Sequence, residues 1–138
     1  MAPLWRLSYH GKLDEVRSAL ARGEDVNNKD SLGMTALMLA VANSHNSIAK
    51  LLLEQPRVKI NEKNNYGWTA LHRAAYSNNR EGARMLLLQT TMDANAKNDS
   101  GHTAVMTAVF RDQKEVLSEL VSHESVSLDI GNVVGSGR

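Results

Sequence analysis

The chain has 138 residues, of which 42% are hydrophobic and 4% aromatic, and it contains no cysteine. Its formal net charge of +1 provides no long-range attraction to phosphate backbones or anionic membranes. The length suits one modest domain, the lack of cysteine excludes disulfides and thiolate chemistry, and no apolar run approaches the ~20 residues of a membrane-spanning helix.

The N-terminal segment, MAPLWRLSYHGKLDEV, carries a charge at Arg6 and has no apolar stretch as long as a signal peptide requires. Without such a signal we expect an intracellular protein, located in the cytoplasm, the nucleus or both. From Leu4 onward this segment also matches later parts of the chain, which indicates an internal repeat.

The repeat has a period of 34 residues, or 33 for its N-terminal copy. Three sets of residues keep the longer spacing: Gly33, Gly67 and Gly101; Thr35, Thr69 and Thr103; and Asn27, Asn61, Asn95 and Asp129. Such a period is typical of proteins that stack one supersecondary unit several times. We predict a single domain over residues 1–130, with units at about 1–31, 32–65, 66–99 and 100–130, followed by a flexible Gly-rich tail at 131–138.

Each unit predicts two short helices. A threonine precedes the first apolar stretch, where its hydroxyl can accept an unpaired N–H group of the first helical turn. The helix then places residues such as Leu71, Ala74 and Ala75 on one side. Residues that tolerate a left-handed conformation follow at Gly11, Ser44, Asn78 and Asp112. After a second amphipathic helix, the alternation of Val58 and Ile60 with polar residues predicts an extended return.

Helices of about nine residues cannot bury their apolar sides alone, so the units are expected to stack on one another. The alternative is a compact helical bundle whose segments resemble one another by accident. Because Gly, Thr, Ala and Asn all keep the same register, the stacked arrangement is favoured.

The pattern of the units resembles the ankyrin repeat family. The segment GWTALH followed by Ala74 and Ala75 is similar to the turn and first helix of that family, and GEDVN at 23–27 is similar to its repeat end. The resemblance implies an all-α fold, namely an ankyrin-repeat α-solenoid of four stacked helix–turn–helix units joined by β-hairpin-like turns. Only His72 keeps the family's motif histidine, which implies histidine–threonine hydrogen bonding in the third unit alone.

No motif for catalysis or cofactor binding occurs in the chain. The five histidines occupy unmatched positions of the units, without the HxxxH or HExxH spacing of a zinc site: His10, His45, His72, His102 and His123. No GxGxxG or GxxxxGK[ST] loop is present for nucleotides, and no GxSxG elbow for a nucleophilic serine. We therefore expect a protein that is not an enzyme and that needs neither a cofactor nor a metal.

The few aromatic residues gather at positions that the resemblance marks as variable, beside the turn glycine and at the end of the first helix. Five of the six aromatics are there: Tyr9, Tyr66, Trp68, Tyr76 and Phe110. Aromatic and arginine side chains are enriched in the centres of protein interfaces. The resemblance implies a partner-binding set on a concave face and the turn tips: Tyr9, Leu32, Met34, Asn43, Tyr66, Trp68, Tyr76, Ser77, His102, Phe110 and Arg111.

Within this set, Trp68 and Tyr76 are the expected anchors, and Arg111 and Asn43 the polar contacts that orient a partner. The expected function is a non-catalytic module that binds another protein or a peptide, not a membrane. Two alternatives are self-association through the apolar face of the fourth unit and a structural role within a longer chain. Nucleic-acid binding is disfavoured because acidic residues intersperse the loose basic zone of Arg73, Arg80, Arg84 and Arg111.

Overall fold

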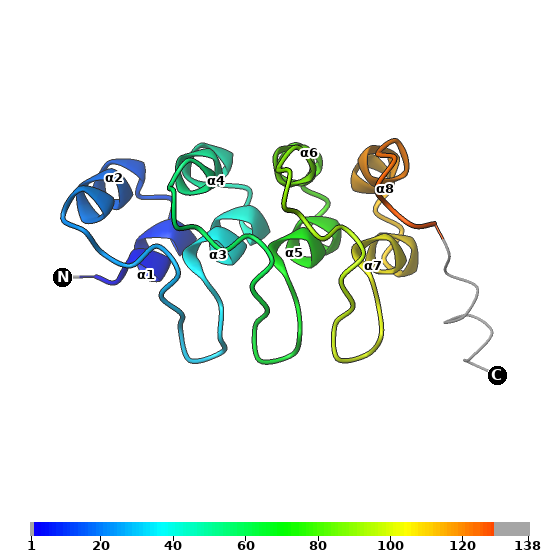
Figure 1. Cartoon of the computed structure of the whole chain (residues 1–138), viewed down its shortest axis with the longest axis horizontal. Helices are drawn as coiled ribbons and strands as arrows, with labels where there is room; N and C mark the ends of the chain where they lie inside the picture. The colour runs from blue at the N-terminus through cyan, green and yellow to red at the C-terminus, as the bar shows by residue number, and fades with distance from the viewer. Residues whose placement is uncertain (1, 129–138) are drawn as a thin grey trace.

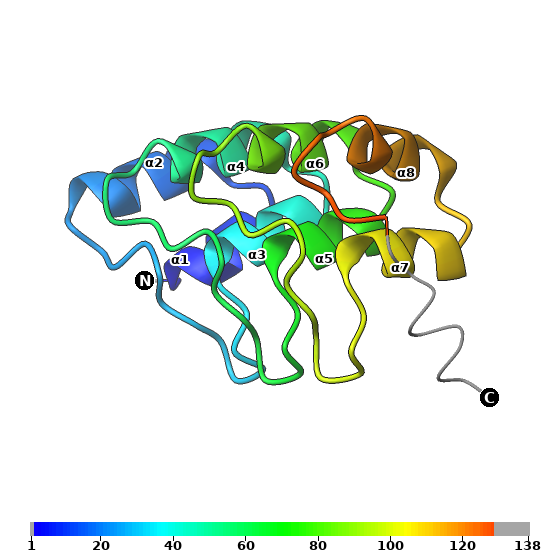
Figure 2. The ribbon, with the colours of Figure 1, turned by 45° about the vertical axis from the view of Figure 1, so that its right-hand side comes forward.

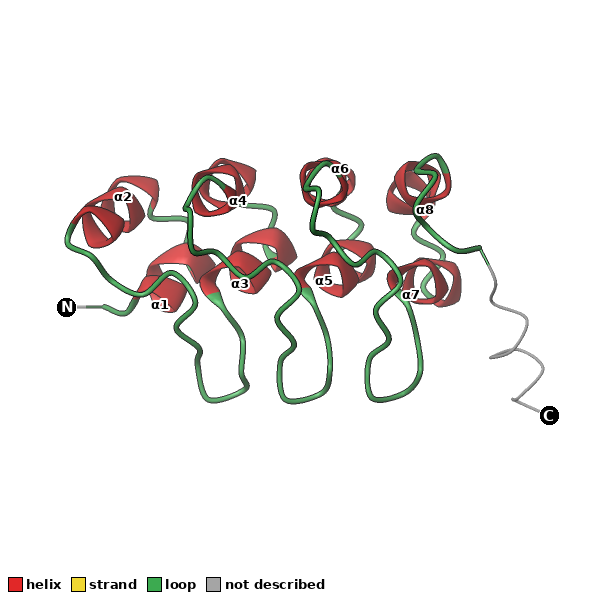
Figure 3. Cartoon of the chain, viewed as in Figure 1, coloured by secondary structure: helices red, strands yellow, loops and turns green. Residues whose placement is uncertain are grey.

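The computed structural model describes residues 2–128. In this part of the chain, α-helices form two rows, and three long turns project from one side (Figure 1). The inner row consists of α1 (Leu4–Tyr9), α3 (Ala36–Ala42), α5 (Ala70–Tyr76) and α7 (Ala104–Phe110). The outer row consists of α2 (Leu13–Ala21), α4 (Asn46–Leu53), α6 (Arg80–Leu87) and α8 (Lys114–Val121). The predicted all-α solenoid of four helix pairs is confirmed, and the described residues contain no strand (Figure 3).

Each helix pair is stabilised by its neighbours. The inner helices contact one another in succession, from α1 to α7, and each also contacts the outer helix of its own pair. Turning the molecule keeps both rows intact and leaves the three turns side by side (Figure 2). Burial therefore depends on stacking between units, as expected for helices too short to fold alone.

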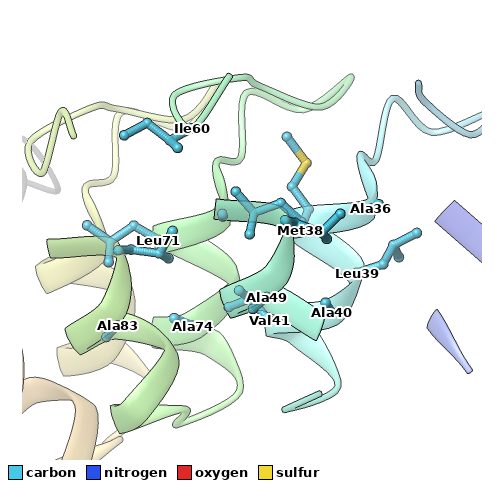
Figure 4. Close-up of a cluster of buried hydrophobic side chains, with 14 of the residues drawn as sticks. Ala36, Met38, Leu39, Ala40, Val41, Ala49, Ile60, Leu71, Ala74 and Ala83 are labelled. Carbon is cyan, nitrogen blue, oxygen red and sulfur yellow. The ribbon is translucent and has the colours of Figure 1, made fainter. Parts of the chain in front are cut away.

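The core between the rows is aliphatic. It contains leucine, isoleucine, valine, methionine and alanine side chains, and no Phe, Tyr or Trp side chain of the described residues is fully buried in it. Buried alanines such as Ala40, Ala74 and Ala83 lie on the helices of this core, together with the larger Leu71, and Ile60 adds to it from a loop (Figure 4). Four of the six Phe, Tyr and Trp side chains are exposed on the surface, whereas Trp5 packs against the core.

Threonine caps begin the inner helices after the first. All three threonine side chains accept a backbone N–H at 3.3 Å, from Met38 to Thr35, from His72 to Thr69 and from Met106 to Thr103. In the third unit Nδ1 of His72 accepts the N–H of Thr69 at 3.2 Å, as the resemblance implied. The fourth unit adds an unexpected counterpart, because the sulfur of Met106 takes the N–H of Thr103 at 3.5 Å.

The long turns share one hydrogen-bonding scheme. The side-chain oxygen of Asp30, Asn64 or Asn98 accepts two backbone N–H groups, two and four residues further on. The backbone of the same residue bonds across the turn, as in the 2.9 Å bond from Asn64 N–H to the carbonyl of Trp68. Neighbouring tips are also tied together, since Asn65 N–H donates to the carbonyl of Leu32 at 2.9 Å. The turns thus hold their tip residues in a repeated geometry.

The asparagines that repeat every 34 residues each bond to the backbone of the following unit. The amide of Asn61 donates to the carbonyl of Thr91 at 2.7 Å and accepts the N–H of Asp93 at 2.8 Å. Asn27 and Asn95 make the same pair of bonds to the following unit. Each side chain therefore pairs two backbone groups of the next irregular segment, which would otherwise lack a partner.

The left-handed positions between paired helices are also confirmed. Backbone φ is +74° at Gly11, +59° at Ser44, +54° at Asn78 and +55° at Asp112. The predicted return between units is not helical: Val58 lies in irregular backbone and Ile60 in a turn. The bonds from Asn27 pair its backbone groups.

The last described unit leaves apolar side chains on its surface. Val109, Val121 and Leu128 are exposed there. The end of the predicted fourth unit and the Gly-rich tail at 131–138 lie outside the described residues.

Candidate functional site

Inner helices and turn tips share one surface, here called the concave face. Tyr9, Tyr76 and Phe110 are the last residues of α1, α5 and α7, and all three side chains are exposed. At the turn tips, Leu32 and Tyr66 are exposed as well, Tyr66 to 60%. The fold therefore repeats these positions along one row of helices and one row of tips.

Trp68 and Tyr76 form an aromatic cluster with two arginines. Their rings meet edge to face with centroids 5.6 Å apart. The guanidinium carbon of Arg111 lies 3.9 Å from the centroid of Tyr76, and that of Arg73 lies 5.2 Å from Tyr76 and 5.6 Å from Trp68. Stacking of this kind holds arginine side chains against aromatic rings while their N–H edges stay available.

A second pair extends the surface toward the fourth unit. The rings of His102 and Phe110 have centroids 4.9 Å apart. Ser77, which follows α5 directly, is half-buried beside the cluster. The predicted set from Tyr66 to Arg111 is thus brought together by turns and helix ends that are far apart in sequence.

An open pocket of about 540 Å³ lies on the same face, between the inner helices α1, α3 and α5 and the first two tips. We call it the inner pocket. Its lining comprises Trp5, Arg6, Tyr9, His10, Asp30, Leu32, Met34, Leu39, Asn64, Tyr66 and Arg73. Arg73 connects the inner pocket to the cluster of Trp68 and Tyr76.

The Arg73 guanidinium is only partly reached by solvent. Its Nε is buried and has no hydrogen-bond partner among the described residues. Burial lowers the pKa of Arg73 below its ordinary value, while the nearby Tyr76 raises it. A desolvated cation without a compensating acceptor is costly, so it favours binding of an acceptor.

Two predicted residues have roles within the chain. Met34 is only 6% exposed, because its turn folds it inward, where the amide of Asn64 contacts its sulfur at 3.2 Å. It therefore belongs to the floor of the inner pocket rather than to an exposed apolar centre. Asn43 donates to the carbonyl of Tyr9 at 2.9 Å, so its amide closes the end of α1.

Seven residues of the inner pocket were not in the predicted partner-binding set: Trp5, Arg6, His10, Asp30, Leu39, Asn64 and Arg73. Arg6, Leu39 and Arg73 occupy the same position of the repeat, at spacings of 33 and 34 residues. All three line the inner pocket. The sequence does contain a signal for these three residues: the residue type at this repeat position changes from unit to unit, whereas the neighbouring core positions stay apolar.

The buried His72 lies under Trp68, with ring centroids 5.6 Å apart. Its Nε2–H donates to the carbonyl of His102 at 2.8 Å, while Nδ1 accepts the N–H of Thr69. Burial lowers the pKa of His72 below its ordinary value of 6.5, and the bond to His102 offsets this only in part.

Acidification is therefore expected to destabilise the protein through His72. Below pH 6.5 the unfolded chain binds a proton at His72 that the folded chain does not. The free energy of unfolding therefore decreases as the pH is lowered, and it levels off once the pH is below the pKa of His72 in the folded state. Urea unfolding between about pH 8 and 5 measures this, and His72→Met supplies the control because methionine fills the same position at Met38 and Met106. Parallel pH profiles for wild type and variant would contradict the assignment.

The remaining histidines do not assemble a metal site. Residues 2–128 hold no group of three or more His, Cys, Asp or Glu side chains placed to bind a metal ion. His45 contacts the carbonyl of Tyr9 instead, and His123 contacts the hydroxyl of Ser125. Within the same residues, every helix is too short or too polar to cross a membrane.

The sequence of the chain is similar to that of known proteins. A family model described as ankyrin repeats (3 copies) matches residues 4–98, more than half of the chain. The ARF GTPase-activating protein Git of Drosophila melanogaster is 44% identical over 52 residues. That match covers 38% of the chain and 7% of the Drosophila protein, so the chain spans a small part of this relative. Both its repeat geometry and these matches lead to one conclusion: the chain belongs to the ankyrin repeat family.

Proposed function

We propose that this chain is a non-catalytic interaction module, an adaptor or scaffold, that binds a protein or peptide on its concave face and turn tips. One observation carries the proposal. Exposed aromatic side chains and arginines gather on a single face, while no Phe, Tyr or Trp side chain of the described residues is fully buried. Apolar patches of this kind on a protein surface mark contact sites, and aromatic and arginine anchors dominate their binding energy.

The partner-binding set consists of the exposed residues Tyr9, Leu32, Tyr66, Tyr76, Phe110 and Arg111 and the partly or largely buried Met34, Trp68, Ser77 and His102, with Asn43 at the rim. Stacked units hold these side chains in place before binding, so little conformational entropy is lost on association. We propose an intracellular setting for this binding, in the cytoplasm or the nucleus.

A second candidate is self-association through the fourth unit. It is favoured by the exposed Val109, Val121 and Leu128 at that end of the described chain. Gel filtration over a range of concentrations tests it. A dimer that dissociates when Val121 is replaced by Asp would support this candidate. A monomeric elution volume at every concentration would exclude it.

The concave-face proposal predicts that Tyr66→Ala/Tyr76→Ala/Phe110→Ala abolishes partner capture from a native lysate. These three side chains are exposed, so the folded state should survive, and truncating each anchor is expected to weaken binding by about 2 kcal/mol, roughly thirtyfold. Affinity capture compared with wild type measures the loss.

Leu88→Ala is the matched control, because Leu88 is the most exposed large apolar side chain of the described residues and lies at the end of the outer helix α6. Thermal unfolding of all three proteins checks that they are equally folded. If the triple variant captures the same proteins in equal amounts, the binding site does not lie on the concave face.

A further inference from the structure

The inner pocket combines an apolar lining with unpaired positive charge. Tyr9, Leu32 and Tyr66 form its exposed apolar rim. Arg6 and Arg73 lie in the lining, and neither forms an ion pair with any residue of the part that the structure describes. The pocket therefore offers cations beside a space that suits an apolar side chain.

Asp30 is the one carboxylate in this lining, and it already serves its own turn. Its Oδ1 accepts the N–H of Leu32 at 2.9 Å and that of Met34 at 2.8 Å. The Asp30 carboxylate therefore bonds to its own turn and forms no ion pair with Arg6 or Arg73. Within the described chain, two arginines and one carboxylate line the pocket.

The outer row of helices shows the contrasting arrangement. Arg80 and Arg84 both contact Glu119, at 3.3 Å and 3.1 Å. The hydrogen bond from Arg84 is the largest cause that lowers the pKa of this carboxyl. Arg80 and Arg84 of the outer surface therefore share a carboxylate within the chain, whereas Arg6 and Arg73 of the inner pocket form no ion pair with a described residue.

Arg73 is held ready for an acceptor. Stacking against Trp68 and Tyr76 restricts its guanidinium, and its buried Nε lacks a partner in residues 2–128. A carboxylate that approached the open side of this group would form a charge-assisted, bidentate pair in a partly desolvated place. Such a pair is stronger than one between freely solvated side chains.

We propose that the inner pocket recognises an acidic peptide segment of a partner protein, with a carboxylate paired to Arg73 and an adjacent aliphatic or aromatic side chain seated against Tyr9, Leu32 and Tyr66. This inference rests on the proposed function and names the chemistry of its partner. A nucleic acid fits the pocket less well, because phosphates need a continuous basic stripe. Here Asp30 lies in the pocket, and Asp99 lies beside its rim, where its N–H donates to the carbonyl of Tyr66.

Selection from a random peptide display library, with the wild-type chain as bait, tests the proposal even though the natural partner is unidentified. Selected peptides are expected to carry Asp or Glu next to a large apolar residue. The tightest peptide is then synthesised in two forms, with its acidic residue kept or replaced by the matching amide. Fluorescence anisotropy measures the dissociation constant of each form.

The acidic form is expected to bind wild type about tenfold or more tightly than the amide form, and Arg73→Gln is expected to remove that preference. Because the amide exchange is made in the peptide, this comparison does not depend on the folding of a variant. Arg73→Lys should retain part of the preference, since lysine keeps the charge but not the planar fork. Arg17→Gln is the matched control, an exposed arginine of the outer helix α2.

The outcomes separate this inference from the proposed function. Peptides that lose affinity with Tyr66→Ala but bind equally well in both forms would overturn the acidic partner while the concave-face site stands. If the selected peptides bind Tyr66→Ala and Arg73→Gln as tightly as wild type, or if no peptide is selected, both the inference and the proposed function would be overturned. Oligo-dT binding tighter than the selected peptide, and lost with Arg73→Gln, would assign the pocket to nucleic acid and overturn the inference.

Discussion

Replacing Leu71 by alanine is expected to lower the free energy of unfolding by about 3 kcal/mol. Leu71 is only 1% exposed and belongs to α5, which contacts α3, α6 and α7. The truncation removes buried apolar atoms and leaves a cavity that neighbouring helices can fill only in part. Urea unfolding followed by circular dichroism of the helices measures the change.

Leu88→Ala deletes the same atoms at a position that is 71% exposed, so it should change the free energy by no more than about 0.5 kcal/mol. Both proteins are expected to unfold in one transition, because each helix pair depends on its neighbours. A loss below about 1 kcal/mol for Leu71→Ala would mean that the stack can repack around the gap, contrary to the close packing of its helices.

Replacing Gly67 by alanine is expected to cost about 2 to 3 kcal/mol of stability. Its φ of +79° strains any residue with a Cβ atom. An added Cβ would also lie 2.8 Å from the backbone nitrogen of Asp99, which donates to the carbonyl of Tyr66 at 3.0 Å. The substitution should therefore break the bond between two tips and displace Tyr66 and Trp68 from the concave face.

Gly101→Ala separates the two causes. Gly101 has the equivalent place in the next turn and a φ of +81°, but an added Cβ there would meet nothing within 4 Å. Only the backbone strain applies, so about 1 kcal/mol is expected. Thermal or urea unfolding compares the two variants, and equal losses would show that contact between the tips contributes little.

Local features of the fold were predictable because each depends on a few consecutive residues. Thr69 caps a helix wherever an apolar helical stretch follows, and Asn78 can adopt a positive φ through its own backbone tolerance. The alternation at Val58 and Ile60 predicted a return that is not helical, but it did not show that the distant Asn27 pairs the backbone there. That contact joins residues of different units, which no local pattern reports.

The candidate site was predictable only in part. Repeat register indicated which aromatics lie at helix ends and tips, and the exposed positions of Tyr9, Tyr66 and Phe110 agree with that interpretation. Register alone did not reveal that Met34 turns inward, because its burial depends on Asn64 of the next turn.

What the sequence by itself determined is the repeat, its two helices per unit and its aliphatic core, since these follow from periodicity and local backbone preference. Only the tertiary structure decided that Arg6 and Arg73, from separate units, line one pocket and that Arg73 forms no ion pair among the described residues. The physical reason is that pairing and solvation of a charge depend on every element packed around it. A sequence pattern describes one element at a time, whereas electrostatic compensation belongs to the assembled face.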